Sequence, residues 1–158
     1  MSTKIIETFY HAFAKGDVDG MVRCYHENIQ FHDPLFGSLS GDEVPDMWRM
    51  ILSRNRGVDI SFGNVKADDK TGSADWQASY VFSRTARKVF NKISSNFEFA
   101  DGKIIRQNDN FDLWKWSRQA FGLSGLLFGW TSTFQNKLKK QSRELLEGFR
   151  NGPSLRES

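Results

Sequence analysis

The sequence predicts one α+β domain in which a curved antiparallel sheet, apolar on its concave face, wraps around helices. Three observations lead to this fold class. A length of 158 residues suits one domain. Apolar residues follow a helical spacing near the start of the chain, and from Val58 to Phe111 they alternate as in strands. Helices followed by a run of strands are typical of α+β proteins.

Helical spacing predicts two helices at the start of the chain. The apolar positions of the first are Ile6, Phe9, Tyr10 and Phe13. Gly16 is suited to end it, and Asp17 is a candidate N-cap for the second. The apolar positions of the second are Val18, Met21, Val22 and Tyr25. A third helix is expected over 44–52, where the apolar face is strong.

Alternation with a period of two predicts the strands. A short strand over 29–33 ends before Pro34, and the segment from Gly37 to Gly41 is expected to be a loop. The four later strands are expected at 58–62, 76–82, 93–99 and 105–111. Asp101-Gly102 is typical of a tight hairpin between the last two.

The composition narrows the class of protein. Hydrophobic residues make up 39% and charged residues 26%, as in ordinary globular domains, whereas 14% aromatic residues suggests a cavity or a partner surface. The single cysteine, Cys24, excludes a disulfide within the chain and a cysteine-based zinc site, and it fits a cytoplasmic location. The histidines lack metal-ligand spacing, so no metal is expected. No secretory signal or membrane-spanning stretch is recognised.

The end of the chain is the basic part. Residues 115–158 contain 8 basic and 3 acidic side chains, while the whole chain has a net charge of +3. Thr131 or Ser132 can cap a last helix. Its expected apolar stripe is Phe134, Leu138, Leu145 and Phe149, and its expected basic face is Lys137, Lys139, Lys140 and Arg143. We expect a core domain over 1–116 and a helical extension over 117–158.

The extension is expected to pack on its own domain or on a second subunit, so a homodimer is predicted. A basic amphipathic helix also suits contact with a membrane surface, which is the alternative. Trp114 and Trp116 beside a basic tail resemble a stacking platform for single-stranded nucleic acid. These rings lead into a helix-like apolar stretch and not onto a basic sheet face, so no nucleic acid partner is expected.

Two carboxyl groups break apolar strand faces and are the candidate catalytic residues. Asp33 shares a face with Ile29 and Phe31, and Asp109 is expected to share one with Gln107, Ile105 and Phe111. A buried carboxylate is costly unless it is paired, hydrogen-bonded or protonated, and burial raises its pKa toward the range useful for acid–base catalysis. Structural interpretations are also open: Asp33 can cap the turn at Pro34, and Asp109 can pair with Arg49 or Arg84.

Two segments carry a resemblance to a known family. FAKGDVDG at 13–20 and FHDPLFGS at 31–38 resemble the helix–Gly-Asp–helix opening and the strand-plus-turn of the nuclear transport factor 2-like superfamily. This superfamily includes the SnoaL-like and ketosteroid isomerase-like proteins. The resemblance covers roughly residues 3 to 116. It implies a cone-shaped α+β barrel with a pocket for an apolar small molecule.

The resemblance also implies roles for individual residues. Asp33 falls on the general base of the isomerases, and Asp109 lies on the strand where other SnoaL-like members place an acid–base aspartate. Their helix tyrosine falls on Phe9, one place from Tyr10, and their protonated aspartate falls near Ser95. An epoxide hydrolase-like Asp–Arg–Asp set would need Asp33, Asp109 and either Arg84 or Arg106.

Together, these observations predict a pocket protein that transfers protons on an apolar carbonyl compound without a cofactor, as an isomerase, lyase or cyclase. Asp33 is the expected base and Asp109 the second acid–base group. The expected ligand-binding residues are Tyr10, Trp48, Trp76, Tyr80, Phe82, Ser95, Phe97, Gln107 and Phe111. The alternative is a module of the same fold that binds or dimerises without catalysis.

Overall fold

The computed structural model describes residues 2–152, and residues 153–158 of the predicted extension lie outside that range. Helix α1 (Ser2–Ala14) buries the predicted apolar face, and Gly16 follows it with a φ of +72°. Asp17 caps α2 (Val18–Val22) by accepting a hydrogen bond from the Gly20 backbone N–H at 2.9 Å. Helix α2 is shorter than predicted, because Tyr25 begins a strand and does not extend the helical stripe.

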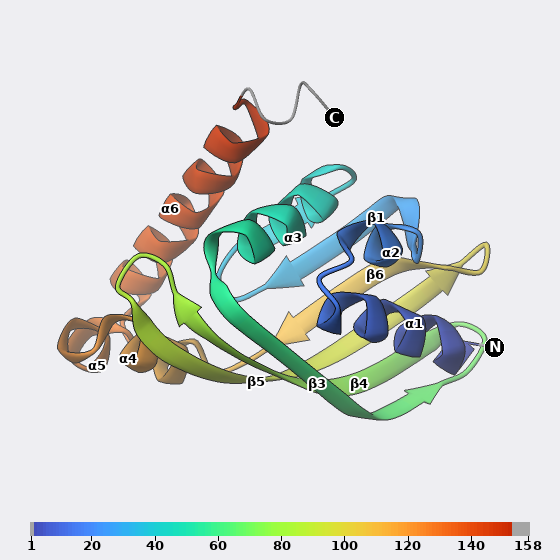
Figure 1. The fold of residues 1–158 in the computed structure, drawn as a ribbon, viewed down its shortest axis with the longest axis horizontal. Coiled ribbons are helices and arrows are strands. Elements are labelled where there is room, and N and C mark those ends of the chain that lie inside the picture. The colour runs from blue at the N-terminus through green and yellow to red at the C-terminus, as the bar shows by residue number, and fades with distance from the viewer. Residues whose placement is uncertain (1, 153–158) are drawn as a thin grey trace.

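Six strands form one curved sheet, which is drawn in Figure 1 with α1 and α3 (Glu43–Arg54) lying along it. The strands in chain order are β1 (Tyr25–Asp33), β2 (Gly37–Ser40), β3 (Arg56–Ala67), β4 (Thr71–Phe82), β5 (Arg87–Ala100) and β6 (Lys103–Asn110). Their order across the sheet is β2-β1-β6-β5-β4-β3. The predicted α+β architecture is confirmed.

Two details of the predicted sheet are wrong. The segment expected to be a loop is the edge strand β2, because the turn after Asp33 folds it back against β1 with Asp33 opposite Gly37. The sheet is also not wholly antiparallel, since β1 and β6 run parallel. Alternation along one strand says nothing about the direction of its neighbour, so the sequence pattern did not reveal this pairing.

A β-bulge also changes which isoleucine of β6 faces the core. The register shifts between Glu98 and Phe99 of β5, so that Phe99 lies opposite Ile104. Ile104 is therefore fully buried, where Ile105 was expected. Beyond the bulge, Gln107 and Asp109 occupy the inward face as predicted.

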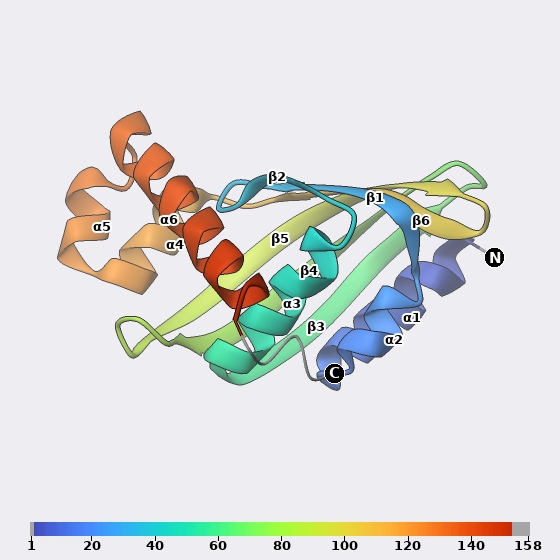
Figure 2. The ribbon, with the colours of Figure 1, turned by 90° about the horizontal axis from the view of Figure 1, so that it is seen from above.

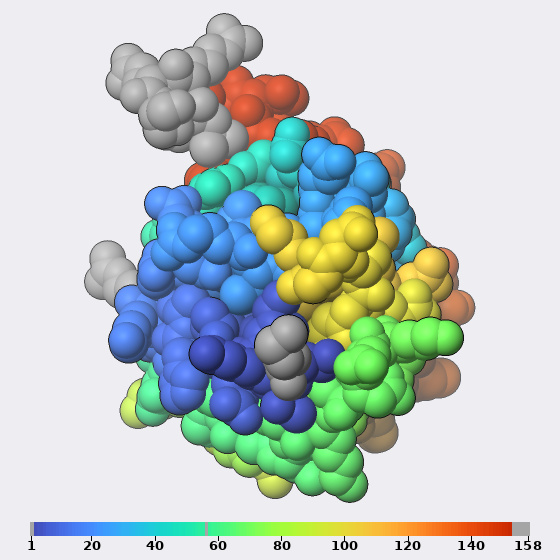
Figure 3. Space-filling model, turned by 90° about the vertical axis from the view of Figure 1, so that its right-hand side faces the viewer, coloured from blue at the N-terminus to red at the C-terminus, as the bar shows by residue number. Residues whose placement is uncertain are grey.

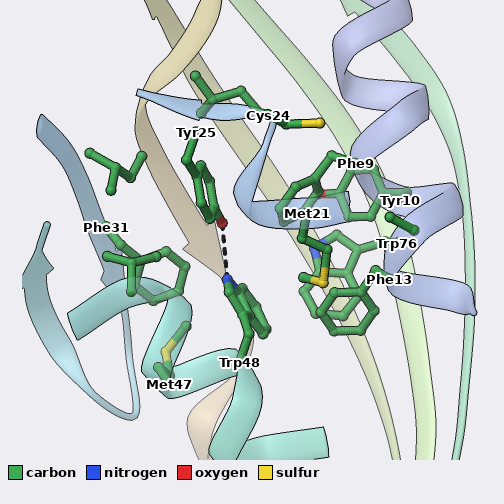
Figure 4. Close-up of a cluster of buried hydrophobic side chains, with 14 of the residues drawn as sticks. Phe9, Tyr10, Phe13, Met21, Cys24, Tyr25, Phe31, Met47, Trp48 and Trp76 are labelled. Atoms are coloured by element: carbon green, nitrogen blue, oxygen red, sulfur yellow. Dashed lines mark hydrogen bonds between the residues drawn. The ribbon is translucent and has the colours of Figure 1, made fainter. Parts of the chain in front are cut away.

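Aromatic side chains fill the space between the sheet and the helices (Figure 4). Trp48 of α3 makes edge contacts with Phe13 of α1 at 4.9 Å between ring centroids and with Phe31 of β1 at 5.7 Å. Trp76 of β4 contacts Phe13 at 5.4 Å. Figure 3 shows the end of the molecule where the N-terminus lies. There α1 and α2 (blue) pack beside the β5–β6 turn (yellow) and the β3–β4 turn (green).

Three helices follow the sheet within residues 2–152: α4 (Leu113–Phe121), α5 (Leu123–Phe128) and α6 (Ser132–Arg150). Thr131 caps α6 by accepting from the Phe134 N–H, one of the two caps predicted. Leu138 and Leu146 are the buried residues of α6, whereas Leu145, expected in the apolar stripe, is 45% exposed. Helix α6 lies against α3 (Figure 2). Within residues 2–152, no helix is long and apolar enough to cross a membrane.

Candidate functional site

The parallel pairing of β1 with β6 brings the two candidate carboxyl groups together. Phe31 lies opposite Gln107 in this pair, so Asp33 and Asp109 each follow by two residues in the same direction. Residues two apart on a strand share a face, and neighbouring strands lie about 4.8 Å apart. Asp33 and Asp109 are therefore neighbours on the concave face, at the same end of both strands.

Both carboxyl groups line one small cavity of about 80 Å³. Aromatic rings form much of its wall, including Trp48 of α3, Trp76 of β4 and Trp116 of α4. Asp33 and Asp109 are 8% and 3% exposed. The site is thus apolar except for the two carboxyl groups, the Tyr80 hydroxyl and the Asn91 amide.

Asp33 is held by the turn that follows it. Its Oδ1 accepts hydrogen bonds from the backbone N–H groups of Leu35 at 2.9 Å and Phe36 at 2.6 Å. Burial raises the pKa of Asp33 from 3.8 to about 7, and the Asp109 charge adds to this rise while the Phe36 and Leu35 N–H groups oppose it. Asp33 therefore caps the turn, as the sequence suggested, and also lines the cavity.

Asp109 is held by two side chains of the sheet. Its Oδ1 accepts hydrogen bonds from the Ser95 hydroxyl at 2.5 Å and from Gln107 Nε2 at 3.1 Å. Burial raises the pKa of Asp109 from 3.8 to about 6, although these two hydrogen bonds oppose the rise.

No arginine neutralises the pair among the residues that the structure describes. Arg49 forms ion pairs with Asp46 and Asp19, so it does not play the structural role considered for it beside Asp109. Arg84 donates to Gln141 at 3.1 Å, and Arg106 pairs with Glu98 at 3.3 Å on the outer face. The Asp–Arg–Asp set is therefore not assembled.

Two chains of hydrogen bonds fix Asp109 from behind the cavity. In one, Trp76 Nε1 donates to Ser95 Oγ at 2.8 Å, and Ser95 donates to Asp109. In the other, Trp48 Nε1 donates to the Tyr25 hydroxyl at 3.0 Å, the dashed contact of Figure 4, and Tyr25 donates to Gln107 Oε1 at 2.7 Å.

Helical spacing predicts Tyr25 in the second helix and gives it no role at the site. The register of β1 shifts between Tyr25 and Gln30, which interrupts the alternation that marks a strand. Asn91, also missed, could have been found, because it precedes Ile93 by two residues and so belongs to the same strand face.

The structure divides the predicted ligand-binding residues into three groups. Those that line the cavity are Trp48, Trp76, Tyr80 and Phe111. Those that lie behind it and are wholly or nearly wholly buried are Tyr10, Ser95, Phe97 and Gln107. Phe82 lines a neighbouring groove. Tyr10 is notable because its buried hydroxyl has no hydrogen bond of good geometry within residues 2–152, although Ser95 is near.

The groove adjoins the cavity and is larger. It has a volume of about 650 Å³ and runs between α3, α4, α6 and the turn after β4. Five residues wall both spaces: Leu35, Phe36, Ile51, Tyr80 and Trp116. Trp116 Nε1 donates to the Tyr80 hydroxyl at 2.8 Å, so this pair stands between the cavity and the groove. No cluster of three metal-ligating side chains occurs within the described part of the chain.

Comparison with known proteins places this geometry in a family. The model of the SnoaL-like domain matches residues 6–107. No curated protein matches the sequence. Several solved structures share the fold, among them an NTF2-like protein of unknown function from Burkholderia pseudomallei, with a TM-score of 0.68, 16% identity and coverage of 76% of this chain and 97% of that one.

Two further structures share the fold. A Catenulispora acidiphila protein with a ketosteroid isomerase-like fold, solved with trimethylamine, has a TM-score of 0.67 at 12% identity and covers 80% of this chain and 96% of its own. An LEH-like epoxide hydrolase from M. tuberculosis has a TM-score of 0.63 at 19% identity, covering 81% and 90%. Because the family model spans well over half of the chain, and the fold agrees, this protein belongs to the SnoaL-like family of the nuclear transport factor 2-like superfamily.

Proposed function

We propose that this protein is an enzyme that moves protons on an apolar carbonyl compound, without a cofactor. The observation that carries the proposal is the pair Asp33 and Asp109 on the wall of one apolar cavity. Their pKa values, raised to about 7 and about 6, give the site one carboxylate and one carboxylic acid together near neutral pH.

This protonation state suits isomerisation and related reactions. The ionised carboxylate removes a proton from the carbon next to the carbonyl, and the protonated one donates a hydrogen bond to the oxygen on which negative charge develops. The removed proton is then returned to another carbon of the same ligand. Proton and charge balance within the site, since the product leaves both carboxyl groups as they began.

The shape of the site indicates how a ligand is held. A cavity of about 80 Å³ accommodates only a small reacting group, whereas the adjoining groove of about 650 Å³ takes an apolar body. The ligand would place its carbonyl beside the aspartates and extend past Tyr80 and Trp116. An epoxide hydrolase mechanism is less well supported, because Arg84 and Arg106, the arginines considered for it, are engaged with Gln141 and Glu98 and do not join the two aspartates.

Proton exchange in heavy water tests the proposal. The probe is β-tetralone, an apolar bicyclic ketone with acidic hydrogens beside the carbonyl. We expect the protein to accelerate deuterium incorporation at that carbon, and Asp33→Asn or Asp109→Asn to slow it by about 100-fold or more, as is usual for loss of a general acid or base. NMR follows the exchange, and Asp69→Asn, at an exposed aspartate, is the matched control that should keep the wild-type rate.

Either of two results would contradict the proposal. One is an exchange rate that persists in both variants. The other is β-tetralone binding with no acceleration over buffer, which would favour the alternative, a non-catalytic binding module.

A further inference from the structure

Helix α5 presents its large apolar side chains to solvent and buries its glycines. Gly125 and Gly129 are the buried positions of this segment. The exposed ones are Leu123, Leu126, Leu127, Phe128 and Trp130, which are 45–69% exposed. This is the reverse of the arrangement that packing against its own domain would favour.

Close backbone contact with α4 holds the helix in this orientation. A Cβ atom on Gly125 would lie 1.9 Å from the Ser117 carbonyl oxygen, and one on Gly129 would lie 2.8 Å from the Ser117 Cβ. Only glycine fits here. The leucines and Phe128 must therefore point away from α4, and the exposed cluster is fixed by the fold.

The charged residues next to this cluster are basic. From residue 113 to residue 143 the chain has no acidic residue, and Lys115 and Arg118 lie on α4, which packs against α5. Arg143, farther along α6, is engaged at β2, where it donates to the Ser38 carbonyl at 2.6 Å. Trp114 connects the apolar cluster to the basic residues. Its Nε1 donates to the Leu126 carbonyl at 3.2 Å, and the Arg118 guanidinium lies 4.5 Å from its ring centroid.

We propose that α5 and its basic surroundings dock the protein on an anionic lipid surface. Apolar side chains would enter the boundary of the acyl chains, the tryptophans would lie at the level of the headgroups, and Lys115 with Arg118 would face lipid phosphates. Helix α5 lies at the end of the long axis opposite the N-terminus (Figures 1 and 2), so the rest of the molecule does not block its approach.

A second copy of the chain fits this surface less well. A six-residue helix is about 9 Å long. A stable protein interface buries about 800 Å² on each partner, which a short convex tip does not supply. A lipid surface needs no matching shape, and the uniform positive charge complements anionic headgroups but repels an identical tip.

Vesicle sedimentation tests the proposal with the full chain. We expect the protein to pellet with vesicles of phosphatidylcholine and phosphatidylglycerol in equal parts, much less with phosphatidylcholine alone, and less as salt rises from about 0.1 M to about 1 M. The double variant Leu127→Ser with Phe128→Ser should weaken binding by on the order of tenfold or more, because it removes two apolar side chains from the lipid. Both residues are exposed, so the fold should be retained.

Matched controls use positions away from α5. Leu145→Ser removes a side chain that is 45% exposed in the second half of α6, and Lys4→Glu reverses an exposed charge on α1. Both should bind like the wild type, whereas Lys115→Glu should bind more weakly. Absence of binding to anionic vesicles would overturn the proposal. So would a dimer that the Leu127→Ser, Phe128→Ser variant dissociates, because the surface would then belong to a second copy.

Discussion

Replacing Asp33 by asparagine is expected to stabilise the protein at about pH 8 and to have much less effect at about pH 5. Between the unfolded pKa of 3.8 and the folded pKa of about 7, the native state holds a proton at Asp33 that the unfolded chain has lost. The free energy of unfolding therefore falls as pH rises through this range. A pKa raised from 3.8 to about 7 corresponds to about 4 kcal/mol lost once the group is fully ionised.

The asparagine variant does not lose this stability at high pH, and it can still cap the turn that follows residue 33. Its amide oxygen can still accept from the Leu35 and Phe36 N–H groups, but the side chain never ionises. Urea denaturation at the two pH values measures the difference between variant and wild type, which should grow with pH. The exposed Asp69→Asn variant controls for the loss of one negative charge from the chain. A difference for Asp33→Asn that stays constant with pH would contradict the pKa assigned to this group.

Tyr25→Phe is expected to destabilise the protein by about 2–4 kcal/mol, because it leaves two buried polar groups without partners. The lost hydroxyl accepts from Trp48 Nε1 and donates to Gln107 Oε1. Neither the Trp48 N–H nor Gln107 Oε1 can form a hydrogen bond with water instead, because Tyr25, Trp48 and Gln107 are all buried. A melting temperature lower by about 5–10 °C should be measured.

Tyr10→Phe is the matched control for this prediction. Tyr10 is as deeply buried as Tyr25, but its hydroxyl makes no hydrogen bond of good geometry within the described residues. We therefore expect its loss to change the melting temperature much less. Equal effects of the two substitutions would contradict the prediction, because the hydrogen bonds of Tyr25 would then add nothing beyond the loss of a buried hydroxyl.

The helices and strands were largely predictable because their signals are local. Apolar spacing placed α1 and α3, and alternation placed β3 to β6. The interaction of α5 with α4 was not predictable in this way. Apolar composition from Phe121 to Trp130 indicates burial, but the close approach at Gly125 turns the leucines outward.

The candidate site was predictable in its members but not in its assembly. Asp33 and Asp109 stand out because each is a carboxyl group on an apolar strand face. Their meeting depends on the parallel pairing of β1 with β6, which joins segments about 75 residues apart and leaves no trace in either strand's own pattern. The role of Tyr25 was not predictable for a similar reason, because its hydrogen-bond partners, Trp48 and Gln107, lie on other elements.

The most direct test of the central claim is the titration of Asp33 and Asp109 by NMR of their carboxyl carbons, assigned with the two asparagine variants. The account predicts that both groups titrate well above 3.8, with apparent pKa values near 7 and 6. It also predicts that Asp109→Asn lowers the pKa of Asp33, because a neighbouring negative charge is removed. Both groups titrating near 3.8 would contradict the account, since the site would then hold two carboxylates and no acid at neutral pH.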